Sequence, residues 1–130
     1  NPNGANLAAS GIASVSGDTW LLSGSGVPNG PGLYFQGVNQ LGGGNGVLFG
    51  DGLRCAGGTV IRLGIVQASS NSSTYPSPNP PATNAIPIGA KGLNVAGNVR
   101  NYQLWYRDSA SFCTAAVFNL TNALNLTWTP

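Results

Sequence analysis

No segment of this 130-residue chain repeats its apolar residues every three to four positions, as an amphipathic helix would. Short runs of β-branched and aromatic residues are separated by Gly, Pro and Asn, and turn signals recur about every 8 to 12 residues. This pattern is typical of an all-β domain. We expect a two-sheet antiparallel β-sandwich of the Ig-like or jelly-roll-like kind, and a small barrel is the main alternative.

The pattern predicts about eight or nine strands. They are expected at residues 11–16, 19–24, 33–36, 47–49, 53–55, 59–67, 99–107, 115–120 and 123–128. The first two read as a hairpin across the turn at Gly17-Asp18. The run at 59–67 is almost continuously apolar, which indicates burial, and in 99–107 alternation places Trp105 and Arg107 on one face and Tyr102 and Tyr106 on the other.

Residues 68–90 differ from the rest of the chain because they are rich in Ser, Asn and Pro and hold little to bury. We expect a long exposed connection there, partly in the polyproline II conformation. The length of the chain fits one domain, so residues 1–130 are predicted to form a single secreted β-sandwich domain around this connection.

The side chains that usually carry catalysis are scarce. The chain has no His and no Glu, and its only acidic residues are Asp18, Asp51 and Asp108. A glycosidase would have to pair Asp51 with Asp108, and a Ser–Lys dyad would have to use the single Lys91. We therefore expect no enzyme, no cofactor and no metal, although a Ca²⁺ ion at Asp51 stays open as an alternative.

Charge is also scarce, at 6% of residues, and the net charge is +2. The five cations are spread along the sequence without a cluster, so nucleic acid is not an expected partner.

No apolar run approaches the roughly 18–20 residues that span a bilayer. A surface with so little charge favours association, so self-assembly or display with another extracellular protein stands beside a plain soluble module. The start without Met suggests a processed product or a fragment.

Cys55 and Cys113 are the only cysteines, and no CxxC motif is present. Each lies near a predicted strand in a chain of extracellular composition, so we predict a Cys55–Cys113 disulfide. Two free thiols in a reducing compartment are the alternative.

Three Asn-x-Ser/Thr sequons stand at Asn71, Asn119 and Asn125. Asn71 lies in the predicted exposed connection and is the best acceptor for N-linked sugar. In a source without this modification all three are ordinary asparagines.

Aromatic side chains offer the main candidate for a binding site, because Trp and Tyr can stack against sugar rings. Tyr102 and Tyr106 share a strand face, Trp105 lies between them, and Tyr75 lies in the predicted connection. These four residues are candidate glycan contacts. The alternative is that they pack in the core.

Three parts of the chain resemble a known pattern. Residues 102–108 (YQLWYRD) followed by 118–128 (FNLTNALNLTW), residues 50–58 (GDGLRCAGG) and residues 32–35 (GLYF) resemble the C-terminal β-domain of largely uncharacterised secreted proteins of planctomycetes and myxobacteria. The resemblance covers about residues 6–130. It implies a secreted β-sandwich at the end of a larger protein and carries over no catalytic residues. The long segment at 68–85 and the position of Cys113 depart from the pattern.

Taken together, these features favour a non-catalytic structural or adhesive module outside the cell or on its surface, as a subunit of a surface or filamentous assembly. The alternative is a glycan-binding module that uses exposed Tyr and Trp side chains.

Overall fold

The computed structural model describes residues 4–49, 52–79, 81–108 and 118–130. Strands account for 55% of the structure and helix is almost absent, which confirms the all-β prediction. In chain order the elements are β1 (Asn6–Ser10), β2 (Leu21–Ser25), β3 (Gly30–Gln40), η1 (Leu41–Gly44), β4 (Val47–Phe49), β5 (Gly52–Arg54), β6 (Ala56–Ala68), β7 (Ser72–Tyr75), η2 (Ala82–Ala85), α1 (Ile88–Lys91), β8 (Val99–Arg107), β9 (Phe118–Leu120) and β10 (Leu124–Thr127).

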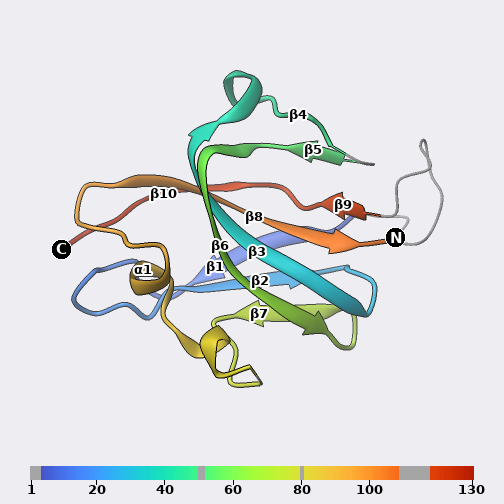
Figure 1. Ribbon diagram of the computed structural model, residues 1–130, viewed down its shortest axis with the longest axis horizontal. Coiled ribbons are helices and arrows are strands. Elements are labelled where there is room, and N and C mark those ends of the chain that lie inside the picture. Colours follow the sequence, from blue (N-terminus) through green and yellow to red (C-terminus); the bar gives the residue numbers. More distant parts are fainter. Residues whose placement is uncertain (1–3, 50–51, 80, 109–117) are drawn as a thin grey trace.

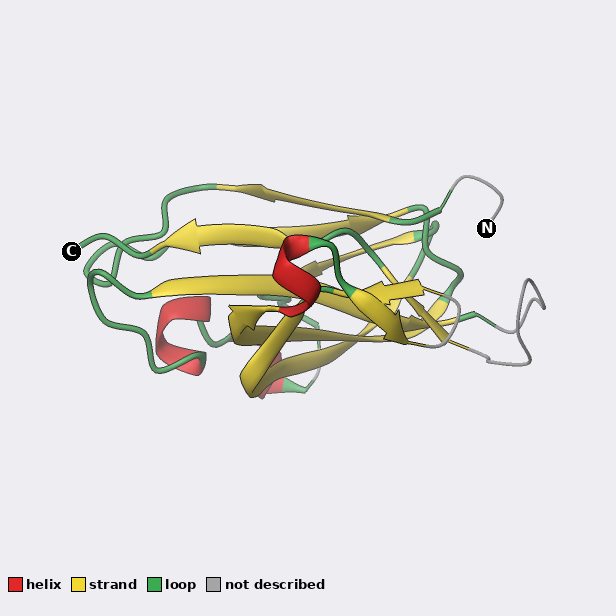
Figure 2. Cartoon of the chain, turned by 90° about the horizontal axis from the view of Figure 1, so that it is seen from above, coloured by secondary structure: helices red, strands yellow, loops and turns green. Residues whose placement is uncertain are grey.

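The strands form two larger sheets and one separate hairpin, and the pairings between these strands are antiparallel (Figure 1). The smaller sheet has the order β1-β2-β7. The larger has the order β10-β8-β3-β6, with β9 paired to β8, and β4 pairs with β5. Figure 2 shows the strands in stacked layers, with α1 at the end of the molecule where the C-terminus lies. Within the described residues no helix has the length and apolar character needed to cross a membrane.

β3 and β6 are the two longest strands of the larger sheet and pair with each other. Their register shifts twice, after Tyr34 and after Gly37. At the second shift the two backbones lie very close together. A Cβ atom at Gly37 would come within 2.5 Å of the backbone N and O atoms of Gly57. Only glycine fits at this position, and the irregularity bends the strand pair where it leaves the sheet.

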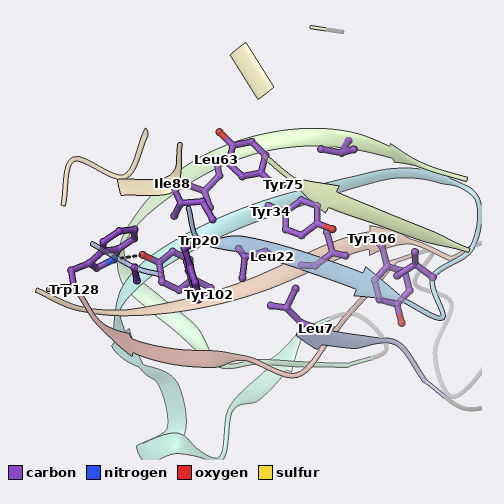
Figure 3. Packing of buried hydrophobic residues seen from close by; sticks show 14 residues of the cluster. Leu7, Trp20, Leu22, Tyr34, Leu63, Tyr75, Ile88, Tyr102, Tyr106 and Trp128 are labelled. Carbon is purple, nitrogen blue, oxygen red and sulfur yellow. Dashed lines mark hydrogen bonds between the residues drawn. The ribbon is translucent and has the colours of Figure 1, made fainter. Parts of the chain in front are cut away.

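The main core lies between the two larger sheets (Figure 3). Leu7, Leu22 and Tyr75 enter it from the smaller sheet, and Tyr34 and Tyr102 enter it from the larger one. Ile88 of α1 and Trp128 after β10 close its end and are almost fully buried. The ring of Trp20 packs edge-on against Tyr102 and Trp128, at centroid distances of 4.8 and 6.0 Å. Such pairs add to the free energy gained by burial.

The predicted first strand is wrong, because β1 is formed by Asn6–Ser10 and residues 11–16 form an irregular segment. Leu7 is the buried anchor of β1, whereas Ile12 and Val15 are 64% and 41% exposed. Gly11 adopts a φ of +82°, which ends the strand there. β2 overlaps the expected strand at 19–24 and pairs with β1, but residues 11–20 connect the two strands, so the predicted tight turn at Gly17-Asp18 is wrong.

The other predicted strands agree in position with the structure, but one prediction about burial needs correction. β4, β5, β8 and β10 lie where the pattern placed them, and β9 covers the described part of 115–120. β6 contains the expected strand at 59–67, but the prediction that this run is buried is wrong. Leu63 and Val66 are buried while Ile65 is 56% exposed. β6 lies at the edge of its sheet and only one of its faces meets the main core.

Many residues of 68–90 are exposed, as predicted, but the segment is more than a connection, because it contains β7, η2 and α1 and buries several side chains. β7 pairs with β2 and places Tyr75 opposite Leu22. Asn84, also buried, donates from Nδ2 to the carbonyl oxygen of Ile65 at 2.7 Å and accepts at its own carbonyl from the backbone N–H of Ser77 at 2.7 Å. Side-chain and backbone hydrogen bonds thus hold this polar segment on the sheet, which composition alone did not indicate.

Candidate functional site

A second, smaller apolar cluster contains side chains of β3 and β8 that are absent from the main core. Phe35, Ala56 and Leu120 are buried in it, and Leu33, Phe49 and Trp105 pack against them. Successive side chains of a strand point to opposite faces, so β3 and β8 send alternate residues into the two clusters. Leu33 and Trp105 are direct cross-strand partners. The larger sheet is therefore apolar on both faces.

Three aromatic rings from three strands contact one another in the second cluster. Phe49 of β4 packs edge-on against Trp105 of β8, at a centroid distance of 5.7 Å. Phe118 of β9 lies 5.2 Å from Phe49 and 5.5 Å from Trp105. The β4–β5 hairpin thus contacts the face of the larger sheet through Phe49, and Trp105 is held on two sides while remaining partly exposed.

Gln103 fixes the base of this hairpin. Its side chain is completely buried, and its Oε1 accepts from the backbone N–H groups of Cys55 and Ala56 at 2.9 and 3.4 Å. Its Nε2 donates to the carbonyl oxygens of Leu53 and Thr121 at 2.8 and 2.6 Å. One side chain of β8 therefore satisfies backbone groups from β5, from the start of β6 and from the segment after β9.

Two hollows of about 240 and 280 Å³ adjoin this cluster, and both are lined by Leu33 and Trp105. We call the two hollows together the trough. The first is also lined by Phe35, Phe49, Arg54, Val60, Arg62 and Leu120. The second is also lined by Pro31, Gly32, Ile65, Tyr106, Arg107 and Phe118. Each hollow is slightly smaller than an ordinary ligand site of about 300–1,000 Å³.

Three arginines supply the charge of the trough. Arg54 donates from Nε to the carbonyl oxygen of Ala56 at 3.1 Å, and its guanidinium carbon lies 5.7 and 5.6 Å from the ring centroids of Phe35 and Phe49. These are cation–π distances. Arg62 and Arg107 are exposed.

Among the residues that the structure describes, no carboxylate lines the trough beside these arginines. The two aspartates in that part of the chain, Asp18 and Asp108, do not line the trough. The sequence spreads its five cations without a cluster, but the fold brings three of them to one surface. The alternation that placed Trp105 and Arg107 on one strand face was the single signal of this in the sequence.

The prediction of exposed tyrosines is wrong. Tyr75 and Tyr102 have no exposed surface and Tyr106 is 3% exposed, and all three belong to the main core. They lie on the core face of their strands. There the free energy gained by burying the ring exceeds the cost of burying its single hydroxyl group, which must find a hydrogen-bond partner. Of the four candidate glycan contacts, Trp105 alone keeps a partly exposed ring beside the trough.

Tyr102 takes part in a buried polar network instead of a binding site. Its hydroxyl donates to Oε1 of Gln36 at 2.8 Å. It also accepts from Nε1 of Trp128 at 2.8 Å, the bond that Figure 3 shows as a dashed line. Asn94 also donates from Nδ2 to the same Gln36 oxygen at 2.7 Å. Burial away from water raises the pKa of Tyr102 to about 12, although the bond from Trp128 acts in the opposite direction. The phenol is therefore neutral and serves as a structural link.

The three sequon asparagines lie at different depths. Asn71 is exposed and donates from Nδ2 to the carbonyl oxygen of Val27 at 3.0 Å. Asn125 is exposed and donates from Nδ2 to Oδ1 of Asn101 at 2.9 Å, and Asn119 is half-buried with its Oδ1 accepting from the backbone N–H of Leu120 at 2.8 Å. Glycosylation at these residues stays a prediction.

Cys55 is half-buried and its thiol is free in the structure, whereas Cys113 lies outside the described residues. The disulfide thus stays a prediction. Asp51 also lies outside them, so the Asp51–Asp108 pair and the alternative of Ca²⁺ at Asp51 are not tested. Across the described ranges, His, Cys, Asp and Glu side chains form no group of three that could hold a metal ion.

Comparisons with family models, with curated proteins and with solved structures found no match to this chain. The resemblance to the C-terminal domains of secreted bacterial proteins therefore stays a prediction, and the trough is interpreted from its own chemistry.

Proposed function

We propose that this chain is a non-catalytic extracellular adhesive module that binds its partner in the trough. The observation that carries the proposal is the partly exposed ring of Trp105, which lies between two apolar hollows lined by arginine side chains. Apolar and aromatic walls with a few placed polar groups are typical of a binding site. A guanidinium group is a hydrogen-bond donor without an acceptor atom, so these arginine side chains can donate to a ligand but offer no general base.

We further propose that the two larger sheets form a β-sandwich and that residues 1–130 act as one secreted domain. The core shared by both sheets supports the first point. The low charge supports the second, since Ser, Thr and Asn supply most of the polar surface of this chain. Such a domain presents the trough on the side of the larger sheet that is turned away from the main core.

Trp105→Ala is expected to weaken binding at least about tenfold, because truncating a central aromatic anchor removes one of the largest contributions to an interface. The measurement is retention on a panel of insoluble and immobilised polysaccharides, both neutral and acidic. Leu93→Ala is the matched control, since Leu93 is 79% exposed and does not line the trough. Thermal unfolding of both variants checks that each is folded. Equal retention of the two variants would contradict the proposal.

A second candidate function is self-assembly, and it rests on exposed apolar side chains outside the trough. Leu48 is 84% exposed on β4 and Leu93 is 79% exposed after α1, and neither lines a hollow of the trough. With a net charge of +2, electrostatic repulsion between copies is weak. We expect sedimentation velocity to show concentration-dependent oligomers that Leu48→Lys reduces. A monomer at every concentration, without filaments in electron micrographs, would remove this candidate.

A further inference from the structure

We propose that the trough is selective for an acidic polysaccharide, that is, a chain of sugar rings bearing carboxylate or sulfate groups. This inference rests on the proposed binding role of the trough and adds the chemistry of the ligand.

The charge of the trough is the first argument. Arg54, Arg62 and Arg107 line it, and none of the described residues that line it with them is a carboxylate. The planar guanidinium fork matches a carboxylate or a tetrahedral oxyanion through two parallel hydrogen bonds. Arg54 is also held in place by the Ala56 carbonyl and by two aromatic rings, which lowers the entropy cost of binding.

The shape and surface of the trough are the second argument. Leu33 and Trp105 belong to both hollows, and each hollow has its own arginines, Arg54 and Arg62 in the first and Arg107 in the second. A linear chain with a regular spacing of acidic units can place one ring in each hollow. The apolar C–H face of a sugar ring then packs on the side chains of the floor, while its acidic group reaches a guanidinium at the rim.

An extended acidic peptide fits this surface less well. The floor is formed by β3, which is paired on one side with β6 and on the other with β8. The backbone N–H and C=O groups of β3 are therefore used within the sheet, and a bound peptide would find main-chain partners only along the outer edge of β6. A sugar chain has no such backbone groups to satisfy.

A nucleic acid fits less well because the basic surface is short. Beyond the three trough arginines the chain has two further cations, Lys91 and Arg100, and neither lines the trough. A phosphate backbone carries a charge at every nucleotide and its binding usually draws on a longer basic stripe.

The test compares ligands that differ in charge alone. Immobilised polygalacturonate is set against its methyl ester, and dextran sulfate against dextran, and the salt dependence of binding is measured for each. We expect the acidic member of at least one pair to bind at least about tenfold more tightly than its neutral partner, and to lose that advantage in 1 M salt, where charges are screened within about 3 Å.

The variant Arg62→Gln/Arg107→Gln is expected to lose most of the preference for acidic chains. Both side chains are exposed, so the fold is expected to tolerate the change. Lys91→Gln removes a charge from α1, outside the trough, and is expected to bind as the unchanged protein does.

The outcomes separate this inference from the proposed function. Equal, Trp105-dependent binding of neutral and acidic chains would overturn the inference alone. Absence of binding to every chain, neutral or acidic, would overturn the proposed function as well. Tighter binding of polyglutamate or of single-stranded oligo-dT, lost in the double arginine variant, would replace the polysaccharide with a peptide or a nucleic acid.

Discussion

Gln103→Ala is expected to lower the free energy of unfolding by roughly 2–6 kcal/mol, because four backbone groups lose their partner, two of them in fully buried hydrogen bonds, and each unpaired buried group costs about 1–3 kcal/mol. The groups are the N–H of Cys55 and of Ala56 and the carbonyls of Leu53 and Thr121. Urea unfolding followed by tryptophan fluorescence measures the loss. Binding in the trough should fall too, since Phe49 reaches Trp105 on the hairpin that Gln103 anchors.

Gln67→Ala is the matched control for this experiment. Gln67 is exposed on β6, and its removal should change the free energy of unfolding by no more than about 0.5 kcal/mol. If Gln103→Ala behaved like the control, the hairpin would have to be held to the sheet by its apolar contacts alone.

Raising the pH above 10 is expected to destabilise the protein well before the backbone itself is affected by base. Burial raises the pKa of Tyr102 to about 12 from the ordinary value of 10.0. Between these values the unfolded chain has lost the phenolic proton while the folded chain keeps it, so stability is fully present below pH 10 and falls as the pH rises toward 12. Tyr102 is expected to contribute a total loss of about 2–3 kcal/mol in the free energy of unfolding over this pH range.

Tyr34 and Tyr75 add to this dependence, because burial raises the pKa of both phenols. The measurement is the free energy of unfolding between pH 7 and pH 12. Tyr102→Phe serves as the comparison: it should be less stable at pH 7, since Nε1 of Trp128 loses its partner, but should lose less stability from pH 10 to pH 12. A stability that stays constant up to pH 12 in the unchanged protein would show that the tyrosines are not buried as described.

Local patterns in the sequence predicted the strands with strong apolar alternation and clear turns. β8 was predicted with its bounds and with the division of its two faces, since Tyr102 and Trp105 do point to different clusters. β1 was missed because Leu7 is its only buried side chain, and β7 was missed because Ser72–Tyr75 is polar and becomes a strand only through pairing with β2. Pairing between distant segments is a property of the whole fold and leaves little trace in a single segment.

The candidate site was predicted only in part for the same reason. The sequence offered aromatic residues as the candidate binding site, but whether a ring is exposed depends on which sheet face meets the core. Tyr102 and Tyr106 fill the core, while Trp105, which lies between them in sequence and points to the opposite face, stays at the surface. The arginines of the trough come from β5, β6 and β8 and are up to 53 positions apart in sequence (Arg54 to Arg107), so only the assembled sheet brings them together.

The apolar character of both faces of the larger sheet has a consequence for how this protein can change over evolutionary time. Along β3 and β8, one set of alternate side chains packs in the main core, while Leu33, Phe35 and Trp105 on the opposite face line the trough. A lineage could therefore exchange Leu33, Phe35 or Trp105 for residues suited to a different partner while Tyr34, Tyr102 and Leu104 stay unchanged. The same two strands would keep one inherited core and carry many different specificities.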